Sequence, residues 1–371
     1  MTSDSPYITV VLPVRNEERF LRETLEALAG QDYPTDRYEL IVVDGRSTDR
    51  TCDVAEDFIR RHPQVGIRLL DNPGQLSSRG RNIGVRAARG RLIAVIDGHV
   101  HLPNDQLFAV MERLKEEHGA LCLARPAPLL VPGIENGMPL WIALARKSWL
   151  AHSRQSYIYG DYEGFVDPVS SGFAYDRDVF DRVGYFDETF DAAEDVEFHH
   201  RLKRAGIQAY TSSALTIYSY PRPTLIGLFR QMTRYGVGRA RLIRKHPEAF
   251  TKETLIPAAV FLFFAALPVA ACCAMWSATL GLAYTALFLL YWLLALSAGI
   301  AAARQHHRVL PGMLVALAIC VTHLGLGWGF LKTFFQHHVG SGGLCSLDSA
   351  IQGAAPLAPK GLLDPPCESA K

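Results

Sequence analysis

The sequence predicts an α/β domain with a mostly parallel, doubly wound sheet and helices on both faces, followed by about three transmembrane helices. Short apolar runs alternate with amphipathic stretches in the first hundred residues, two of these runs end in Asp, and the C-terminal part holds long uncharged segments. The 371 residues are 49% hydrophobic and carry a net charge of +1. This near-neutral balance gives no indication of a nucleic-acid partner.

Four strands joined by three helices are predicted in the first hundred residues. Each strand is a short apolar run, the type buried on both faces in a parallel sheet, and each helix shows an apolar stripe or a cap signal. Short connections in a β-α-β order favour a parallel arrangement. The expected strands are 8–14, 39–44, 65–70 and 91–96, and the expected helices are 17–29, a segment ending near 61, and 77–88.

Two strands of this sheet end in a carboxylate. Asp44 and Asp97 would share the edge of the sheet where ligands of parallel sheets bind. His99 lies two residues after Asp97, so in an extended backbone both project the same way and can hold a divalent cation. The alternative is that each Asp caps a helix and the His is solvated, as in most isolated Asp-x-His sequences. The first strand is followed by Arg15-Asn16-Glu17, which excludes a Gly-rich phosphate loop.

A pair of acids begins a helix in the second half of the domain. Glu194-Asp195 precedes an apolar-periodic stretch that closes at Gly206, and a carboxylate there can serve as a general base in a cleft. An adjacent acid raises the pKa of one of the two, although acids in a first turn also follow from the helix dipole. Around it we expect helices at 104–118 and 140–152 and strands at 120–124, 169–175 and 207–213.

The C-terminal part is predicted to lie on and in a membrane. Residues 224–246 form a basic amphipathic helix, and three segments after it have the length and composition of membrane spans: 255–276, 280–303 and 309–335. Arg244 and Arg304 would lie on the cytoplasmic side, and three spans place the tail on the far side. The expected units are a catalytic domain (1–220), a basic interfacial helix (221–252), a transmembrane region (253–338) and a disordered tail (339–371).

Cysteines and the N-terminus exclude other classes. The seven cysteines show neither metal-finger spacing nor a disulfide framework. The first apolar run is too short for a signal peptide, so the catalytic domain is expected in the cytoplasm.

Taken together, these motifs resemble the family 2 glycosyltransferases, which have the GT-A fold, over about residues 6–240. Within the family, the Asp-x-His variant, the 235–239 stretch and the C-terminal spans are most similar to succinoglycan-type exopolysaccharide glucosyltransferases. The matching stretches are Val11–Glu17, Val43–Asp49, Arg81-Asn82 with Ala88–Gly90, Asp97-Gly98-His99 and Glu194-Asp195.

The resemblance implies a role for each matching residue. It implies that Asp44 binds the nucleobase of a nucleotide sugar, that Asp97 and His99 hold Mg²⁺ or Mn²⁺ on the diphosphate, and that Asp195 is the catalytic base. Tyr235 stands where Trp is usual in the Q-x-x-R-W motif of membrane synthases, and this departure bears on processive synthesis. His99 stands where the second Asp of the D-x-D motif is usual, and this departure bears on metal preference. The donor site would further include Pro13, Arg15, Asn16, Glu17 and Arg81, and the acceptor or diphosphate site Glu194, Gln231, Arg234 and Tyr235.

The implied activity is that of an inverting, metal-dependent hexosyltransferase anchored in the inner membrane. It would transfer glucose from UDP-glucose to a polyprenyl-diphosphate-linked saccharide in exopolysaccharide or envelope glycan synthesis. The alternatives are a polyprenyl-phosphate or other lipid acceptor, and a non-catalytic membrane scaffold. A sugar nucleotidyltransferase is disfavoured because its phosphate-binding loop is missing.

Overall fold

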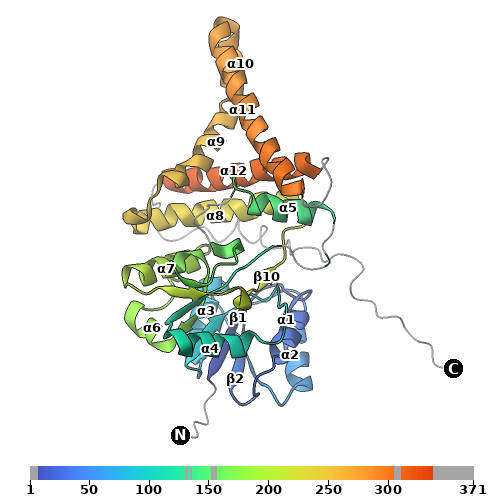
Figure 1. The fold of residues 1–371 in the computed structure, drawn as a ribbon, viewed down its shortest axis with the longest axis vertical. Helices are drawn as coiled ribbons and strands as arrows, with labels where there is room; N and C mark the ends of the chain where they lie inside the picture. The colour runs from blue at the N-terminus through green and yellow to red at the C-terminus, as the bar shows by residue number, and fades with distance from the viewer. Residues whose placement is uncertain (1–6, 130–132, 134–135, 152–156, 305–310, 337–371) are drawn as a thin grey trace, which may run out of the picture.

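The computed structural model describes residues 7–129, 133, 136–151, 157–304 and 311–336 (Figure 1). An eight-stranded sheet of order β3-β2-β1-β4-β8-β6-β9-β7 forms the centre of the N-terminal domain. Its first four strands are parallel to one another, as predicted. They are β1 (Ile8–Val14), β2 (Tyr38–Asp44), β3 (Gly66–Asp71) and β4 (Leu92–Val95).

The predicted helices between these strands are confirmed, with one shifted start. They are α1 (Leu21–Ala29), α2 (Thr51–Arg61) and α3 (Ser77–Ala87). Helix α1 begins at Leu21 rather than at residue 17, because the chain before it is bound to the β2–α2 loop. The Asn16 N–H donates to Ser47 Oγ (2.9 Å) and the Glu17 N–H donates to Thr51 Oγ1 (2.7 Å), which fixes this turn outside the helix.

Pro13 is accommodated near the end of the central strand β1. On one side it pairs in register with Val43 of β2. On the other side β4 pairs only with Ile8–Val11, so that ladder has ended before the proline and its missing N–H interrupts no pairing with β4.

The second half of the sheet is mixed. Strand β8 (Gly172–Asp176) is antiparallel to β4 and β6 (Cys122–Ala124), and β9 (Ala209–Thr211) is parallel to β6 and antiparallel to β7 (Gly164–Val166). The strand predicted at 169–175 is wrong at its start. A 3₁₀ turn, η2 (Pro168–Ser170), replaces it there because the Asp167 side chain accepts a hydrogen bond from the Val169 N–H. A two-stranded sheet pairs β5 (Val100–His101) with β10 (Tyr218–Ser219).

Helices cover both faces of the large sheet and enclose two apolar clusters. One cluster centres on β1 residues such as Ile8 and Leu12 with α1 and α4, and the other on Val11, Tyr175 and Phe198. The other helices of this domain are α4 (Leu107–His118), α6 (Arg177–Val183) and α7 (Glu194–Arg204). Helix α5 (Met138–Lys147) packs instead against α8, α11 and α12. The helix predicted at 140–152 ends at Lys147, and residue 152 lies outside the described residues.

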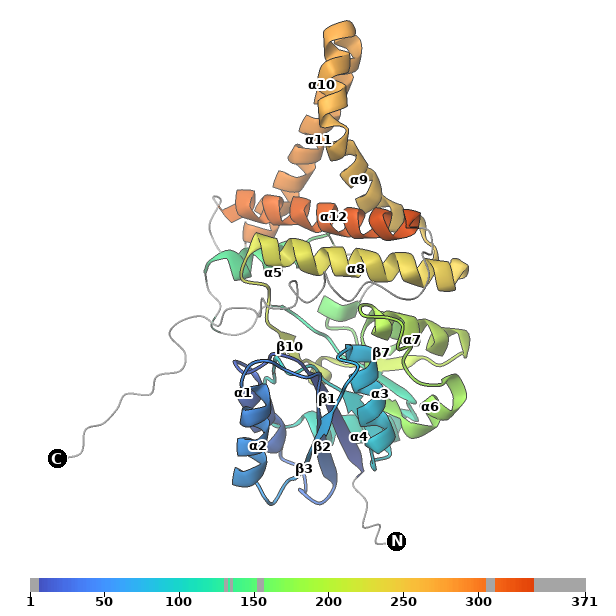
Figure 2. The ribbon, with the colours of Figure 1, turned by 180° about the vertical axis from the view of Figure 1, so that it is seen from behind.

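Helix α8 (Leu225–Lys245) separates the sheet domain from the apolar C-terminal helices. Beyond it are α9 (Leu255–Ala265), α10 (Leu267–Trp276), α11 (Ala278–Ala303) and α12 (Pro311–Phe335). Figures 1 and 2 show α8 and α12 running across the long axis of the molecule, whereas α9, α10 and α11 extend along it. The tail expected to be disordered lies outside the described residues.

Two of these helices, α11 and α12, are long and apolar enough to cross a membrane. The segment predicted as the first span is divided into α9 and α10, which differ in direction by 53° and together count as a possible third span. Pro268 is the second residue of α10. Because proline has no backbone N–H, it cannot donate a hydrogen bond to the last turn of α9, and this explains the break.

Candidate active site

A polar pocket of about 340 Å³ opens where β1 and β4 end, and α8 covers it. Ligand sites of parallel sheets lie at this edge because the loops after the strands converge there. Every residue predicted for the site lines the pocket except Asp44. These lining residues are Pro13, Arg15, Asn16, Glu17, Arg81, Asp97, His99, Glu194, Asp195, Gln231, Arg234 and Tyr235.

Asp97 and His99 lie on this pocket because the chain between them makes a close turn against β1. A Cβ on Gly98 would lie 2.7 Å from Val14 Cγ1, so a larger residue there would push the Asp97–His99 segment away from the sheet. Burial tends to raise the pKa of Asp97, but the positive charges of His99 and Arg81 lower it below the usual range. Asp97 is therefore a carboxylate at neutral pH.

Glu17 fixes the orientation of the His99 ring. Its Oε1 atom lies 2.8 Å from His99 Nδ1, so Nε2 is the ring nitrogen left to bind a ligand. Burial lowers the pKa of His99, but the Glu17 carboxylate outweighs it and the pKa is raised. A carboxylate behind an imidazole is the arrangement that orients metal-binding histidines. The sequence placed Glu17 in the donor pocket; the structure adds this contact with His99.

Arg81 of α3 joins the two acidic parts of the pocket. Its Nη2 atom lies 3.2 Å from Glu194 Oε1 and 3.9 Å from Asp97 Oδ1, and its Nε–H donates to Ser77 Oγ. Burial disfavours its charge, yet the carboxylates of Glu194, Asp195 and Asp97 raise its pKa, so it remains a cation. Arg81 thus places a fixed positive charge between the end of β4 and the start of α7.

Asp195 lies in the first turn of α7, directly on the pocket. The residue before the helix, Ala193, has φ of +61°, a left-handed conformation that costs energy for a residue with a Cβ. Helix α8 holds this turn in place: a Cβ on Gly238 would lie 2.7 Å from Ala192 O and 2.6 Å from Ala193 Cβ. The close packing of α8 at Gly238 therefore holds the start of α7 in the position where the Asp195 carboxylate lines the pocket.

Two arginines of α8 bind the loop that precedes α7. Arg234 Nη2 donates to Asp191 O (2.8 Å), and Arg241 forms an ion pair with the Asp191 carboxylate. On the same helix Gln231 accepts from Arg146 of α5 (3.5 Å) and donates to the Tyr235 hydroxyl (3.5 Å). The predicted Gln231, Arg234 and Tyr235 thus connect three segments around the pocket.

Asp44 is buried at the end of β2 beside the pocket, not on its surface. Its carboxylate accepts hydrogen bonds from the Ser47 hydroxyl (2.5 Å) and the Ser47 N–H (3.0 Å). Asn16 Oδ1 accepts from the Thr48 N–H (2.8 Å), so Asp44 and Asn16 together fix the loop after β2. Asn16 and Arg46 both have φ of +56°, and this strain next to the pocket fits a functional loop.

The family comparison fits this geometry. Residues 9–184 match the model of Glycosyl transferase family 2. The chain carries a family 2 glycosyltransferase domain. Its fold, a largely parallel mixed sheet with the pocket at one edge, agrees with the expected GT-A fold.

Three similar proteins extend the comparison beyond the domain. The Methanococcus voltae protein named dolichyl N-acetyl-alpha-D-glucosaminyl phosphate 3-beta-D-2,3-diacetamido-2,3-dideoxy-beta-D-glucuronosyltransferase is 26% identical, covering 64% of this chain and 74% of that protein. Succinoglycan biosynthesis protein ExoA of Rhizobium meliloti is 29% identical, covering 70% of this chain and 76% of that protein. The structure of mannosyltransferase PcManGT from Pyrobaculum calidifontis with GDP-Man and Mn²⁺ is 20% identical in sequence and covers 85% of this chain and 88% of that protein. Its TM-score of 0.55 shows that the two proteins share the fold.

The pocket of the family 2 domain also fits a divalent cation. Asp97 offers a carboxylate and His99 an imidazole nitrogen, both suited to Mg²⁺ or Mn²⁺. Behind them Glu17 Oε2 is buried without a hydrogen-bond partner among the described residues, while Oε1 of the same carboxylate contacts His99 Nδ1. These residues are consistent with the predicted cation at this place.

A second group of possible metal ligands lies away from the pocket. His200, His246 and Glu248 have ligand atoms within 4.8 Å of one another, where α7 meets the end of α8. Arg204 already pairs with Glu248 (3.1 Å), and His246 Nε2 lies 3.0 Å from Glu197 Oε1. The cluster therefore belongs to the ion pairs that join α7 to α8.

Some pocket residues were not predicted from the sequence. They come from the loop after β3 with the start of α3, the loop before α7, the loop before α8, and α8 itself. Only the loop after β3 carries a sequence signal for a ligand site, because it follows the end of a parallel strand. Arg222 reaches the pocket through the fold of a segment that has no motif. The unpredicted lining residues include Asn72, Gln75, Leu76, Ser77, Asp191, Arg222 and Arg230.

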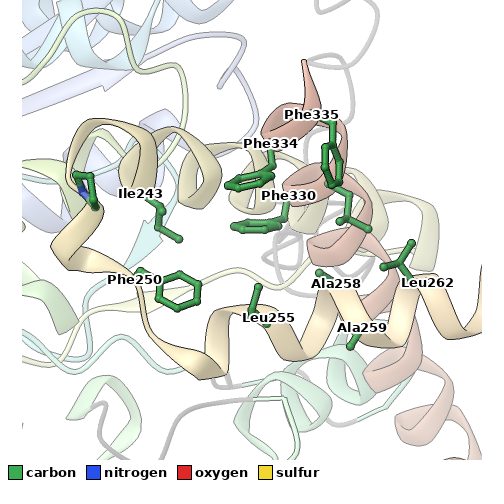
Figure 3. A pocket seen from close by; sticks show the side chains of 11 residues that line it. Ile243, Phe250, Leu255, Ala258, Ala259, Leu262, Phe330, Phe334 and Phe335 are labelled. Atoms are coloured by element: carbon green, nitrogen blue, oxygen red, sulfur yellow. The ribbon is translucent and has the colours of Figure 1, made fainter. Parts of the chain in front are cut away.

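A second hollow of about 560 Å³ lies where α8, α9 and α12 meet (Figure 3). Ile243 of α8, Leu255 of α9 and Phe330 of α12 face it from three sides. Its lining is apolar throughout: Ile243, Pro247, Phe250, Leu255, Ala258, Ala259, Leu262, Phe330, Leu331, Phe334 and Phe335. With no charged side chain in its lining, it is unsuited to a nucleotide, and we call it the apolar groove.

Proposed function

We propose that this glycosyltransferase is an inverting, metal-dependent enzyme that transfers a hexose, glucose from UDP-glucose, to a polyprenyl-diphosphate-linked saccharide. One observation carries the proposal: Asp97, His99 and Asp195 share a polar pocket closed by α8, which lies directly against the apolar helices. This arrangement brings a nucleotide-sugar site to an acceptor held in a membrane.

The donor occupies the part of the pocket built by the loops after β1 and β4. The nucleobase lies at Pro13, Arg15, Asn16 and Glu17, with Asp44 supporting that wall from behind. Asp97 and His99 hold the cation, which when bound neutralises charge on the departing diphosphate. Arg81 and Arg234 place further positive charge at the same pocket.

Asp195 acts as the base. Its carboxylate accepts the proton of the acceptor hydroxyl as the oxygen bonds to the anomeric carbon and the nucleoside diphosphate leaves from the opposite face. One base without a carboxylate nucleophile gives inversion at that carbon. Glu194, paired with Arg81, and Gln231 and Tyr235 of α8 line the acceptor side.

The membrane placement follows the units expected from the sequence. Residues 1–220 form the catalytic domain, 221–252 the interfacial helix and 253–338 the membrane region, with the catalytic domain on the cytoplasmic face of the inner membrane. Apolar helices α11 and α12 and the bent pair α9–α10 support this proposal. The name of the Methanococcus voltae relative refers to a dolichyl phosphate, which favours a lipid monophosphate carrier as the second candidate acceptor.

The test is a donor screen on membranes that contain lipid-linked saccharides. Radiolabelled UDP-glucose is expected to label the lipid fraction in the presence of Mn²⁺ or Mg²⁺, and anomeric analysis of the product is expected to show inversion. Labelling from another nucleotide sugar alone would overturn the choice of donor. Retention of configuration would overturn the mechanism.

A further inference from the structure

The apolar helix α12 packs closely against α8, and the two helices run in the same direction. A Cβ on Gly325 would lie 2.8 Å from Phe229 O, and one on Gly329 would lie 2.0 Å from Thr233 O. From the other helix, a Cβ on Gly236 would lie 2.2 Å from Leu326 O. The two backbones are in contact because glycines line the seam from both sides. Figures 1 and 2 show the pair side by side.

The contact extends to the far end of both helices. Arg244 Nη2 donates to Phe334 O and to Gln336 O (2.8 Å), which satisfies the last carbonyls of α12. At the middle of α12 the buried His323 lies 3.0 Å from Leu150 O, in the segment after α5. Since α12 is held along α8 and to the segment after α5, the two helices share one orientation relative to the membrane.

Helix α8 is unsuited to cross a membrane. Six of its 21 residues are cations: Arg230, Arg234, Arg239, Arg241, Arg244 and Lys245. Arginine at the centre of a membrane helix is among the most costly of all residues, and Arg234 lies at the centre of α8. Gln231, Arg234 and Tyr235 also line the polar pocket, whose charged side chains are costly to bury in hydrocarbon. A basic amphipathic helix with these properties lies along the membrane surface.

The remaining helices contact α12 at two separated places. A Cβ on Gly327 of α12 would lie 2.2 Å from Pro257 O near the start of α9, and one on Gly299 of α11 would lie 2.3 Å from Gly312 O. Gly327 and Gly312 are 15 residues apart, or about 22 Å along the helix. The segment α9–α11 therefore leaves α12 at one point and returns to it at another, as the triangle in Figure 1 shows.

The other end of this segment is a tight helical hairpin. Ser277 alone separates α10 from α11, and a Cβ on Gly281 would lie 2.7 Å from Ala274 Cβ across the turn. Trp276 at the tip is 91% exposed. Helix α11 is about 39 Å long for 26 residues, enough to pass through a hydrocarbon core of about 30 Å.

We infer that α8 and α12 lie together along the membrane surface and that, among the described helices, only the hairpin α9–α11 enters the bilayer, which places both ends of α12 on the side of the catalytic domain. Three spans in series would instead place residue 336 on the opposite side. The apolar groove agrees with the inference, because the surface position of α8 and α12 lets lipid chains cover its lining. The inference rests on the proposed membrane placement and not on sugar transfer.

The experiment compares the two ends of α12 by accessibility. Single cysteines are introduced as R304C before α12, Q336C after it and R50C in the catalytic domain, in a chain whose seven native cysteines are replaced. A membrane-impermeant maleimide is applied to sealed inverted vesicles and to intact cells. We expect all three positions to react in the same preparation and to be protected in the other.

Reaction of R304C and Q336C in opposite preparations would overturn the inference, since α12 would then cross the bilayer. If the cysteine-free chain does not accumulate, protease sites inserted at the same three positions in the native chain give the same comparison. The labelling is repeated with D195N, which lacks the proposed base. A correct topology without transfer then separates failure of the proposed activity from failure of this inference.

Discussion

Helix α8 borders two hollows of opposite character. The polar pocket near its N-terminal half is lined by carboxylates, arginines and His99, and the apolar groove at its C-terminal end is lined by aliphatic and phenyl side chains. Both hollows are built from the same helix with different partners: loops of the sheet domain at one end and α9 with α12 at the other. The comparison teaches that one amphipathic helix can border a polar pocket and an apolar groove at once, which is what the proposed transfer to a lipid-linked acceptor requires.

The largest effect is expected from removing the proposed base in the polar pocket. Asp195→Asn keeps the size of the side chain but cannot accept the hydroxyl proton, so kcat should fall by about 10²- to 10⁴-fold. Binding of the nucleoside diphosphate, measured by calorimetry, should change little. Asp181→Asn, on the exposed surface of α6, is the matched control. Full activity in D195N would remove Asp195 from this role.

The next effect concerns the residue behind His99. Glu17→Gln removes the carboxylate that orients the imidazole and raises its pKa, so the affinity for Mn²⁺ should fall by about 10- to 100-fold. His99→Ala should weaken it further. Titration of the purified protein with Mn²⁺ in the absence of donor measures this affinity directly. Glu18→Gln, at the exposed neighbouring residue, is the control. An unchanged titration in both Glu17 and His99 variants would place the cation elsewhere.

The seam between α8 and α12 should respond to added volume. Gly329→Leu forces a side chain against Thr233 O, which should destabilise the protein by about 1–3 kcal/mol and loosen donor binding through α8. Thermal unfolding in detergent measures the first effect and calorimetry the second. Met313→Leu, on the exposed side of α12, should shift stability by no more than about 0.5 kcal/mol. Equal behaviour of the two variants would contradict the close packing.

The smallest effect is expected in acid, where α7 is joined to α8. Burial tends to raise the pKa values of Asp187 and Glu197, but the hydrogen bonds from Lys245 and, for Glu197, Arg201 outweigh it and lower both. A lowered pKa in the folded state adds stability above the ordinary values of 3.8 and 4.5, and this stability is lost as the pH falls. Lys245→Gln should therefore flatten the acid side of the curve of Tm against pH. Parallel curves for the two proteins would refute the link.

The sheet domain was largely predictable from the sequence, and the reason lies in local pattern. Each of the first four strands is an apolar run ended by a polar residue, and position at one sheet edge follows from parallel order, as for Asp97 and His99. The contact of Glu17 with His99 was not predictable, because it joins residues 82 positions apart through the turn before α1.

The apolar C-terminal part was predictable in composition but not in arrangement. The apolar length of 309–335 predicts a span, whereas its packing along α8 depends on glycines whose partners lie about 90 residues away in sequence. The break between α9 and α10 depends on Pro268 within an otherwise uniform apolar run. A hydropathy profile predicts neither the glycine contacts with α8 nor the break at Pro268, since both depend on backbone geometry.

The apolar cluster under α8 has a consequence for how the protein is made. It is assembled from α5, α8, α11 and α12, through residues such as Trp141, Met232, Ala298 and Ile319. These segments leave the ribosome far apart in time, and Met232 lies one residue from the pocket side chain of Gln231. The polar pocket can therefore reach its final shape only after α12, the last of these helices in the sequence, has been synthesised.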